Sequence, residues 1–120
     1  MRKFETGAIR DDDIKKLDYD GFLSPLAIKR FAQYMHKHRT LKDGSVRESD
    51  NWQKGIPKGQ YRKSLLRHCV DAWSILRGWL KITEEGEDIE ELLCAIIFNS
   101  QGLLHEILKE KLENELSKKM

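Results

Sequence analysis

Near its C-terminal end the chain carries apolar side chains at helical spacing over about thirty residues without a proline, and this feature most constrains the fold. The apolar residues recur every three or four positions from near Asp88 to about Lys118, which is the period of one face of an α-helix. With a rise of about 1.5 Å per residue, such a helix is roughly 45 Å long. Its predicted apolar stripe consists of Ile89, Leu92, Leu93, Ile96, Leu103, Leu104 and Ile107.

Two shorter helices are predicted before this one. Ser24 suits an N-cap, and Pro25 suits the first helical position because its missing N–H would be unpaired anyway. This helix ends in the cationic residues 37–39, which suit a helix C-terminus. The second helix is predicted from about Gln60 to Leu80, after a long loop over residues 40–59. Its apolar stripe consists of Tyr61, Leu65, Cys69, Ala72, Trp73, Leu76 and Leu80.

The rest of the chain adds no further regular element to this prediction. Residues 1–23 show no helical period, so we expect an irregular arm, and no segment has the alternating pattern of a strand. The predicted fold class is therefore all-α: a small bundle of three main helices with an irregular N-terminal arm, completed by oligomerisation. We expect one domain over residues 1–120, with a helical core at 24–108 and a charged helix end at 109–120.

The composition excludes several classes of protein. Hydrophobic residues are 39% of 120, enough for one core, and because small domains bury a smaller fraction of their surface, a second subunit is expected. With 22 basic against 20 acidic residues, the chain lacks the basic excess of a nucleic-acid-binding protein. No apolar run approaches the ~20 residues of a membrane span, and the first residues lack an apolar signal segment. Two cysteines in apolar helical patterns suit a reducing compartment, so we predict a cytoplasmic protein.

The last turns of the long helix alternate in charge around regularly spaced leucines, from about residue 106 to residue 119. One interpretation is a solvated amphipathic tail that is stabilised by Lys and Glu pairs. The other is a seam between two subunits. The sequence favours neither interpretation over the other.

Polar and small side chains recur along one face of the long helix, beside its apolar stripe. They are Asp88, Glu91, Ala95, Asn99, Gly102 and Glu106. On the second helix, His68 and Asp71 are three residues apart and also flank the stripe. If the two helices pack antiparallel, carboxylates and an imidazole converge, and such like charges call for a cation such as Mg²⁺. A solvated helix face, a core or capping role for His68, and an interhelical hydrogen bond from Asn99 are the alternative interpretations.

The segment at residues 51–57 carries unusual chemistry for a connector. Trp52 could stack on a base or fill the core, and neither interpretation is favoured. Lys54 could meet a phosphate, because the glycine after it allows close approach of the backbone. The chain lacks the motifs of P-loop NTPases, zinc proteases and α/β-hydrolases.

These segments together resemble the dATP/dGTP diphosphohydrolases of phages and bacteria, a MazZ-related family. The resemblance covers about residues 4–108 and rests on residues 6–11, 16–19, 23–25, 51–57, 67–68 and 88–99. The order Asn-Trp-x-Lys-Gly, Arg-His, Phe-Asn is fairly specific, whereas each piece alone is weak. The resemblance implies a MazG-like all-α enzyme, a homodimer or homotetramer, that uses Mg²⁺ or Mn²⁺ to hydrolyse dGTP or dATP to the monophosphate and pyrophosphate. It also implies a role in phage purine deoxynucleotide metabolism, in the host cytoplasm.

The resemblance also implies roles for particular residues. Asp71, Asp88 and Glu91 would hold the metal, with His68 as a further catalytic residue. Substrate contacts would come from Arg10, Asn51, Trp52, Lys54, Arg67 and Asn99. MazG-like enzymes have Glu-x-x-Glu and Glu-x-x-Asp where this chain has His68-x-x-Asp71 and Asp88-x-x-Glu91. Imidazole is a poor Mg²⁺ ligand, so His68 would hold a phosphate or a water, or the metal would be Mn²⁺. The alternative function is that of a non-catalytic helical interaction protein.

Overall fold

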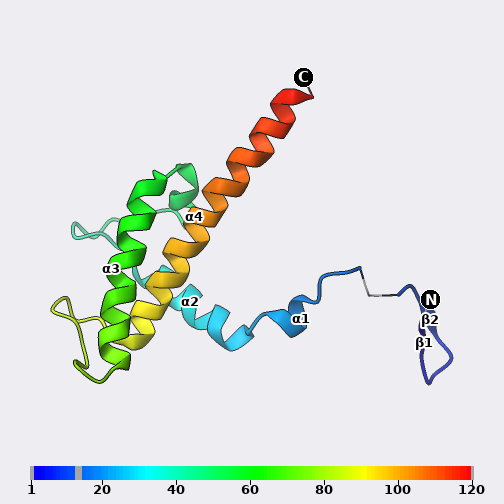
Figure 1. The fold of residues 1–120 in the computed structure, drawn as a ribbon, viewed down its shortest axis with the longest axis horizontal. Helices are drawn as coiled ribbons and strands as arrows, with labels where there is room; N and C mark the ends of the chain where they lie inside the picture. The colour runs from blue at the N-terminus through cyan, green and yellow to red at the C-terminus, as the bar shows by residue number, and fades with distance from the viewer. Residues whose placement is uncertain (1, 13–14, 120) are drawn as a thin grey trace.

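The computed structural model describes residues 2–12 and 15–119, and it confirms the all-α fold class. Figure 1 shows three main helices and an N-terminal arm that leads away from them. The main helices are α2 (Pro25–Lys37), α3 (Lys58–Leu76) and α4 (Ile89–Lys118). A short 3-10 helix, η1 (Asn51–Lys54), lies in the connection between α2 and α3.

The arm contains more regular structure than the irregular segment that the sequence predicts. Strands β1 (Arg2–Lys3) and β2 (Ile9–Arg10) form an antiparallel pair, and α1 (Tyr19–Phe22) is a single helical turn. Two-residue strands are too short to show an alternating pattern in the sequence. Residues 1 and 13–14 of the predicted arm, and residue 120 of the predicted helix end, lie outside the described residues.

The helix ends follow from local chemistry. The Ser24 hydroxyl accepts a hydrogen bond from the Ala27 amide at 3.1 Å, and Asp88 caps α4 in the same way through the amide of Glu91 at 2.9 Å. Helix α3 ends at Leu76, earlier than the predicted Leu80, because Gly78 adopts a positive φ of 81°.

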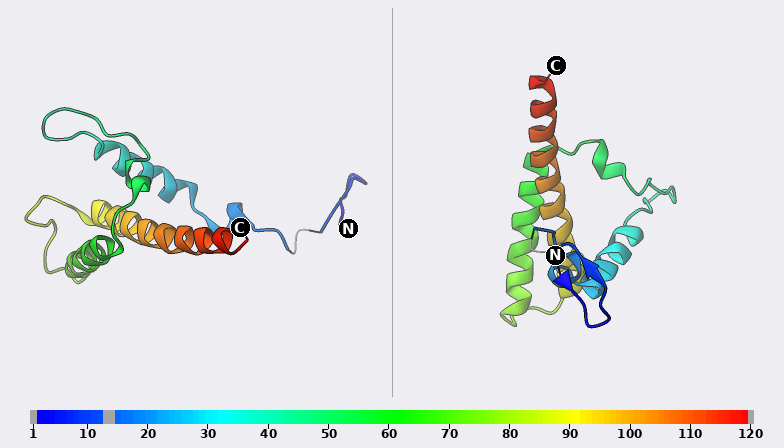
Figure 2. Two further views of the ribbon diagram at one scale, coloured as in Figure 1. Left: turned by 90° about the horizontal axis from the view of Figure 1, so that it is seen from above. Right: turned by 90° about the vertical axis from the view of Figure 1, so that its right-hand side faces the viewer.

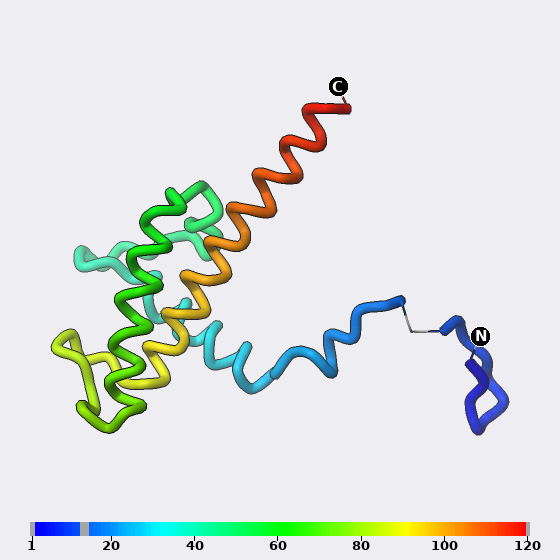
Figure 3. The backbone as a smooth tube through the Cα atoms, in the orientation of Figure 1, coloured from blue at the N-terminus to red at the C-terminus, as the bar shows by residue number. Residues whose placement is uncertain are grey.

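Helices α3 and α4 run antiparallel and lie side by side (Figures 1 and 3). The contact uses the small and polar face of α4, on which Ala95, Asn99 and Gly102 are buried. Tyr61 of α3, only 1% exposed, lies over Gly102, where an added Cβ would stand 2.3 Å from the tyrosine ring. Small side chains therefore let the two backbones approach closely.

The predicted apolar stripes are only partly correct. Trp73 and Leu76 of α3 are 63% and 70% exposed, and Leu104 of α4 is 55% exposed. On α3 the face toward α4 carries Tyr61 and Ala72, so the core lies to one side of the predicted stripe. Hydrophobic periodicity identifies the apolar residues of a helix, but it does not show where glycine and alanine allow two helix backbones to come closest. The buried apolar residues of the described chain are Tyr61, Ala72, Leu92, Cys94 and Ala95.

Helix α2 packs against α4 on a different face from α3, so that α4 is the central helix (Figure 2). Two ion pairs fix this contact: Arg30 with Glu90 at 2.8 Å and Lys37 with Glu91 at 3.3 Å. The chain then leaves α2 and returns to α4 through η1.

The described chain is far from compact. Its radius of gyration is 19.6 Å, whereas about 14 Å is expected for a compact domain of this length. The arm extends away from the helices on one side, and the last turns of α4 project beyond α3 (Figures 1 and 3). Among the described residues, none of the helices combines the length and apolarity needed to cross a membrane.

Candidate functional site

A hollow of about 690 Å³ lies between α2, the connection that follows it, and α4. Four aromatic side chains line it, from all three segments: Phe31, Tyr34, Trp52 and Phe98. Polar side chains share the lining: His36, His38, Arg39, Arg47, Glu48, Ser49, Asn51 and Gln101. Pockets of about 300–1,000 Å³ with apolar walls and a few polar groups are typical of small-molecule sites.

Ring contacts hold the walls of the hollow in place. Trp52 of η1 meets His105 of α4 edge to face, with ring centroids 4.9 Å apart. Phe98 meets Tyr61 of the α3–α4 contact in the same manner at 5.8 Å. Such aromatic pairs stabilise beyond their burial. Through Phe98, the lining of the hollow is therefore in direct contact with Tyr61 in the buried interface between the two long helices.

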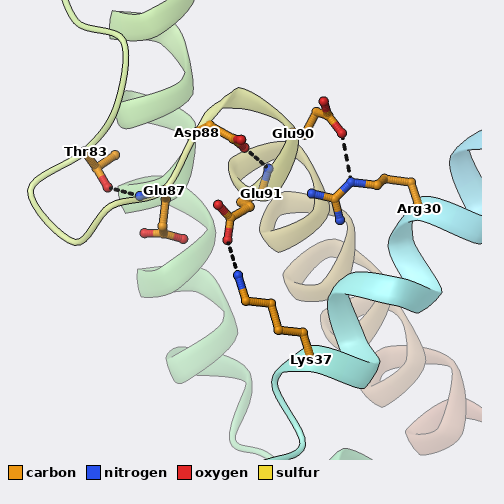
Figure 4. A network of polar contacts seen from close by, with 7 residues as sticks. All are labelled: Arg30, Lys37, Thr83, Glu87, Asp88, Glu90 and Glu91. Atoms are coloured by element: carbon orange, nitrogen blue, oxygen red, sulfur yellow. Dashed lines mark hydrogen bonds and ion pairs between the residues drawn. The ribbon is translucent and has the colours of Figure 1, made fainter.

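An acidic group lies at the start of α4, in the part of the molecule drawn in Figure 4. Glu91 is half-buried and bonds to Lys37, while the Asp88 carboxylate accepts the amide hydrogen of Glu91. Glu87 lies beside them, with its own amide bonded to the Thr83 hydroxyl at 3.0 Å. Glu91 and Phe98 are seven residues apart on α4, so both lie on one face, roughly 10 Å apart along the axis.

The electrostatics of α2 connect the acidic group to the hollow. The pKa of Tyr34 is raised to about 12. The main cause is burial of the phenol, followed by electrostatic interaction with Glu87, Cys94 and Glu91. The Tyr34 ring contacts the His38 ring in a tilted arrangement, with centroids 4.4 Å apart. The pKa of His38 is lowered, first by its partial burial and then by Lys37 and Arg47, while Glu91 and Glu87 act in the opposite sense. Tyr34 and His38 thus line the hollow and also lie within electrostatic reach of Glu87 and Glu91.

Of the four predicted catalytic residues, His68 and Asp71 lie on α3, Asp88 caps α4 and Glu91 lies in its first turn. Because Tyr61 lies over Gly102 and the helices are antiparallel, Asp71 lies level with Leu92, next to Glu91 in the sequence. His68 is half-buried on α3, and its Nδ1 atom is buried without a hydrogen-bond partner among the described residues. Within the residues that the structure describes, however, no three His, Cys, Asp or Glu side chains form a group that could hold a metal.

The predicted substrate contacts divide into two sets. Asn51 and Trp52 line the hollow. Lys54 is exposed on η1, and Arg67 is exposed on α3, where it bonds to Ser64 at 3.4 Å. Neither of these two side chains lines the hollow.

The two remaining predicted contacts lie away from the hollow. Asn99 is 5% exposed, and its amide donates to the Ala95 carbonyl of its own helix at 2.8 Å rather than to another helix of the described chain. Arg10 belongs to β2, which Figure 1 places outside the helical body. Within one chain, Arg10 therefore cannot reach the hollow in this arrangement.

Sequence reasoning missed most of the hollow. It treats residues 40–59 chiefly as a loop around one motif, assigns no role to Tyr34 or Arg47, and gives Arg39 only a place among the cations at a helix end. Two arginines placed on either side of an Asp43-Gly44 turn are the pattern that could have indicated a short hairpin with paired cations.

No protein-family model, no curated protein and no solved structure matches this chain. The fold and the site together describe a helical protein with an aromatic, partly cationic hollow beside an acidic helix start.

Proposed function

We propose that the chain is a subunit of a nucleoside triphosphate pyrophosphohydrolase that acts on dGTP or dATP. The observation that carries the proposal is the hollow of about 690 Å³ on the same face of α4 as Glu91. A planar purine suits the aromatic lining, since rings favour stacked or edge-to-face contacts. The roughly 10 Å between Phe98 and Glu91 along α4 is within the length of an extended nucleoside triphosphate.

The proposed reaction breaks the bond between the α-phosphorus and the bridging oxygen of the β-phosphate, as water adds to the α-phosphorus. The products are a nucleoside monophosphate and pyrophosphate. Trp52 and Asn51 would contact the base or sugar from η1. Glu91 would lie beside the phosphates, where a carboxylate can accept a proton from the attacking water.

The divalent cation that the resemblance implies needs several oxygen ligands. In the described residues of one chain, Glu91 is bonded to Lys37 and Asp88 caps α4, and no group of three suitable side chains forms. The described part of a single chain therefore does not by itself offer Mg²⁺ or Mn²⁺ a ligand set. The proposed role of Asp71, Asp88 and Glu91 as ligands accordingly depends on association with a second subunit.

A second copy of the chain is part of the proposal. The outer face of α3 exposes Leu66, Val70 and Trp73 at helical spacing, and all three are more than half exposed. Helix α4 also carries exposed apolar residues on sides that α2 and α3 leave open, among them Leu93 and Leu104. Exposed apolar surface of this kind is typical of subunit contacts.

The assembly is tested by sedimentation equilibrium. We expect the wild-type mass to be a multiple of the chain mass and the Trp73→Glu variant to shift toward monomer, because a charge on the apolar face would have to be desolvated. Gln60→Glu, which adds a charge elsewhere on α3, is the matched control and should leave the mass unchanged. A monomeric wild-type protein at all concentrations would contradict the assembly.

The activity is tested with a panel of nucleoside triphosphates and detection of pyrophosphate. We expect release from dGTP or dATP above that from the pyrimidine triphosphates, and loss of release when EDTA removes divalent cations. No release from any triphosphate, with Mg²⁺ or with Mn²⁺, would favour a non-catalytic helical interaction protein instead. Release of single phosphates rather than pyrophosphate would place the cleavage at another bond.

A further inference from the structure

Arg39 and Arg47 lie together at the hollow because a short hairpin joins them. The Arg47 amide donates to the Arg39 carbonyl at 2.9 Å, and Thr40 pairs with Val46 as an isolated β-bridge. The guanidinium groups are also tied to the backbone: Arg39 Nε donates to the Arg47 carbonyl at 2.8 Å, and Arg47 Nη2 donates to the His38 carbonyl. Both cations are thus placed by backbone contacts.

The turn of this hairpin is itself well defined. The Leu41 amide donates to the Ser45 carbonyl at 2.8 Å, and Gly44 has a positive φ of 88° that suits glycine. The Asp43 carboxylate accepts hydrogen bonds from the hydroxyl and amide of Ser45, which lower its pKa. Asp43 therefore stabilises the turn and does not neutralise the arginines.

The two guanidinium groups carry charge that the described chain does not pair. Neither Arg39 nor Arg47 forms an ion pair within the part of the chain that the structure describes. Glu48 is the acidic side chain among the residues lining the hollow, so the two cations outnumber it. Each arginine uses one nitrogen for its backbone bond and keeps other N–H groups for a ligand.

We propose that Arg39 and Arg47 bind the phosphate chain of the nucleotide whose base lies in the hollow. This inference rests on the proposed function for the choice of a nucleotide as the ligand. Arginine suits phosphate because its planar fork of donors can form paired charged hydrogen bonds. The two arginines take the phosphate-binding role that sequence reasoning assigns to Lys54 and Arg67, which lie outside the lining of the hollow.

The position of these cations agrees with a phosphate chain that runs toward the start of α4. His38 is within electrostatic reach of Arg47 and also of Glu91 and Glu87, and Lys37 precedes it in the chain. A phosphate chain that passes Arg47 and His38 would therefore come within electrostatic reach of Glu91. Arg47 is exposed and Arg39 is half-buried, so both remain accessible to a ligand.

The inference is tested by isothermal titration without divalent cations, so that neither turnover nor a metal contributes. The probes are deoxyguanosine, dGMP and a dGTP analogue with an imido group between the α- and β-phosphates. For the wild-type protein we expect the triphosphate analogue to bind at least about tenfold more tightly than deoxyguanosine, since charged hydrogen bonds supply the difference. In the double variant Arg39→Gln/Arg47→Gln this ratio should fall to about one, with the affinity for deoxyguanosine unchanged.

Matched variants separate a phosphate contact from a structural role of the hairpin. Arg62→Gln removes an exposed cation of α3 outside the hollow and should leave the ratio unchanged. The double variant Arg39→Lys/Arg47→Lys keeps the charge and should retain part of the preference for the triphosphate. Equal loss of affinity for all three probes in the glutamine variant would mean that the hairpin only shapes the hollow, and this would overturn the inference.

The outcomes distinguish this inference from the proposed activity. If the wild-type preference for the triphosphate is lost in the glutamine variant but no pyrophosphate is ever released, the phosphate site stands and the activity fails. If pyrophosphate is released while the glutamine variant keeps the wild-type preference, the activity stands and the inference is overturned. Loss of the preference in Lys54→Gln or Arg67→Gln instead would also overturn it. A wild-type protein that binds none of the three probes overturns the inference, whereas the activity is decided by pyrophosphate release in the presence of a divalent cation.

Discussion

Replacing Glu91 by glutamine is expected to lower the rate of pyrophosphate release from dGTP by about a hundredfold or more. Glutamine keeps the shape of the side chain but cannot accept a proton at neutral pH, and a positioned acid or base contributes about this much to a rate. Glu91 is the half-buried carboxylate that lies on the same face of α4 as the hollow. The measurement is steady-state pyrophosphate release with the wild-type protein and the variant at equal concentration.

Glu90 provides the matched control, because it is the adjacent carboxylate and its side chain is 66% exposed. Glu90→Gln loses the contact with Arg30 but should retain near wild-type release. Thermal unfolding of Glu90→Gln should differ little from that of the wild type, since exposed ion pairs contribute about 0–1 kcal/mol, and thermal unfolding of Glu91→Gln checks that this variant remains folded. Equal activity of Glu91→Gln and Glu90→Gln would remove Glu91 from the proposed site.

Asp88 allows a second form of the same test. The structural role of Asp88 is to cap α4, and asparagine caps helices about as well as aspartate. Asp88→Asn should therefore keep the stability of the protein while it loses most of the pyrophosphate release. Asp88→Ala should in addition lose about 1 kcal/mol of stability, because the cap itself is removed. Full activity of Asp88→Asn would limit Asp88 to the cap.

Replacing Gly102 by alanine is expected to lower the free energy of unfolding by about 2 kcal/mol or more. The added Cβ would stand 2.3 Å from the ring of Tyr61, which is buried and packs against Phe98. Neither the ring nor the helix backbone can move freely there, and overpacking a core costs about 1–3 kcal/mol. Urea unfolding followed by circular dichroism measures the effect.

Gly59 is the control for the helical preference of alanine. It also lies in a helix, α3, but an added Cβ there would meet only the end of the Arg62 side chain at 4.0 Å. Gly59→Ala should therefore be neutral or slightly stabilising. Tyr61→Leu should partly relieve the effect of Gly102→Ala in a double-mutant cycle, because it removes the ring that the methyl group meets. An additive double mutant would show that the two positions do not interact.

The acidic start of α4 shows how far the sequence could predict the site. The spacing of His68, Asp71, Asp88 and Glu91 predicts that they approach, and the antiparallel register places Asp71 level with the residue that follows Glu91. Whether their carboxylates share a metal remains a prediction, since the described chain forms no such group. Residue spacing predicts which side chains share a face of one helix. It does not predict the salt bridge between Lys37 of α2 and Glu91 of α4.

The hollow shows what spacing could not predict. Its walls come from α2, from the connection after it and from α4, and no period in the sequence relates Tyr34, Arg47 and Phe98. Trp52 packs edge to face on His105 of α4 and also lines the hollow, while its stacking on a base stays a prediction. Contacts between distant segments depend on the angles and positions at which helices pack. The residue types within one segment do not determine these.

The sequence alone determined the three main helices and the starts of α2 and α4, because a hydroxyl at Ser24, a carboxylate at Asp88 and a 3.6-residue period act within a few residues of themselves. Only the tertiary structure decided which faces meet. Helix α4 is apolar on several sides, so burial of apolar area does not select one side for α3. The side of α4 that packs against α3 is the one that allows the two backbones to come closest. Gly102 leaves room there for the ring of Tyr61, whereas larger side chains elsewhere on α4 would hold the two helices apart.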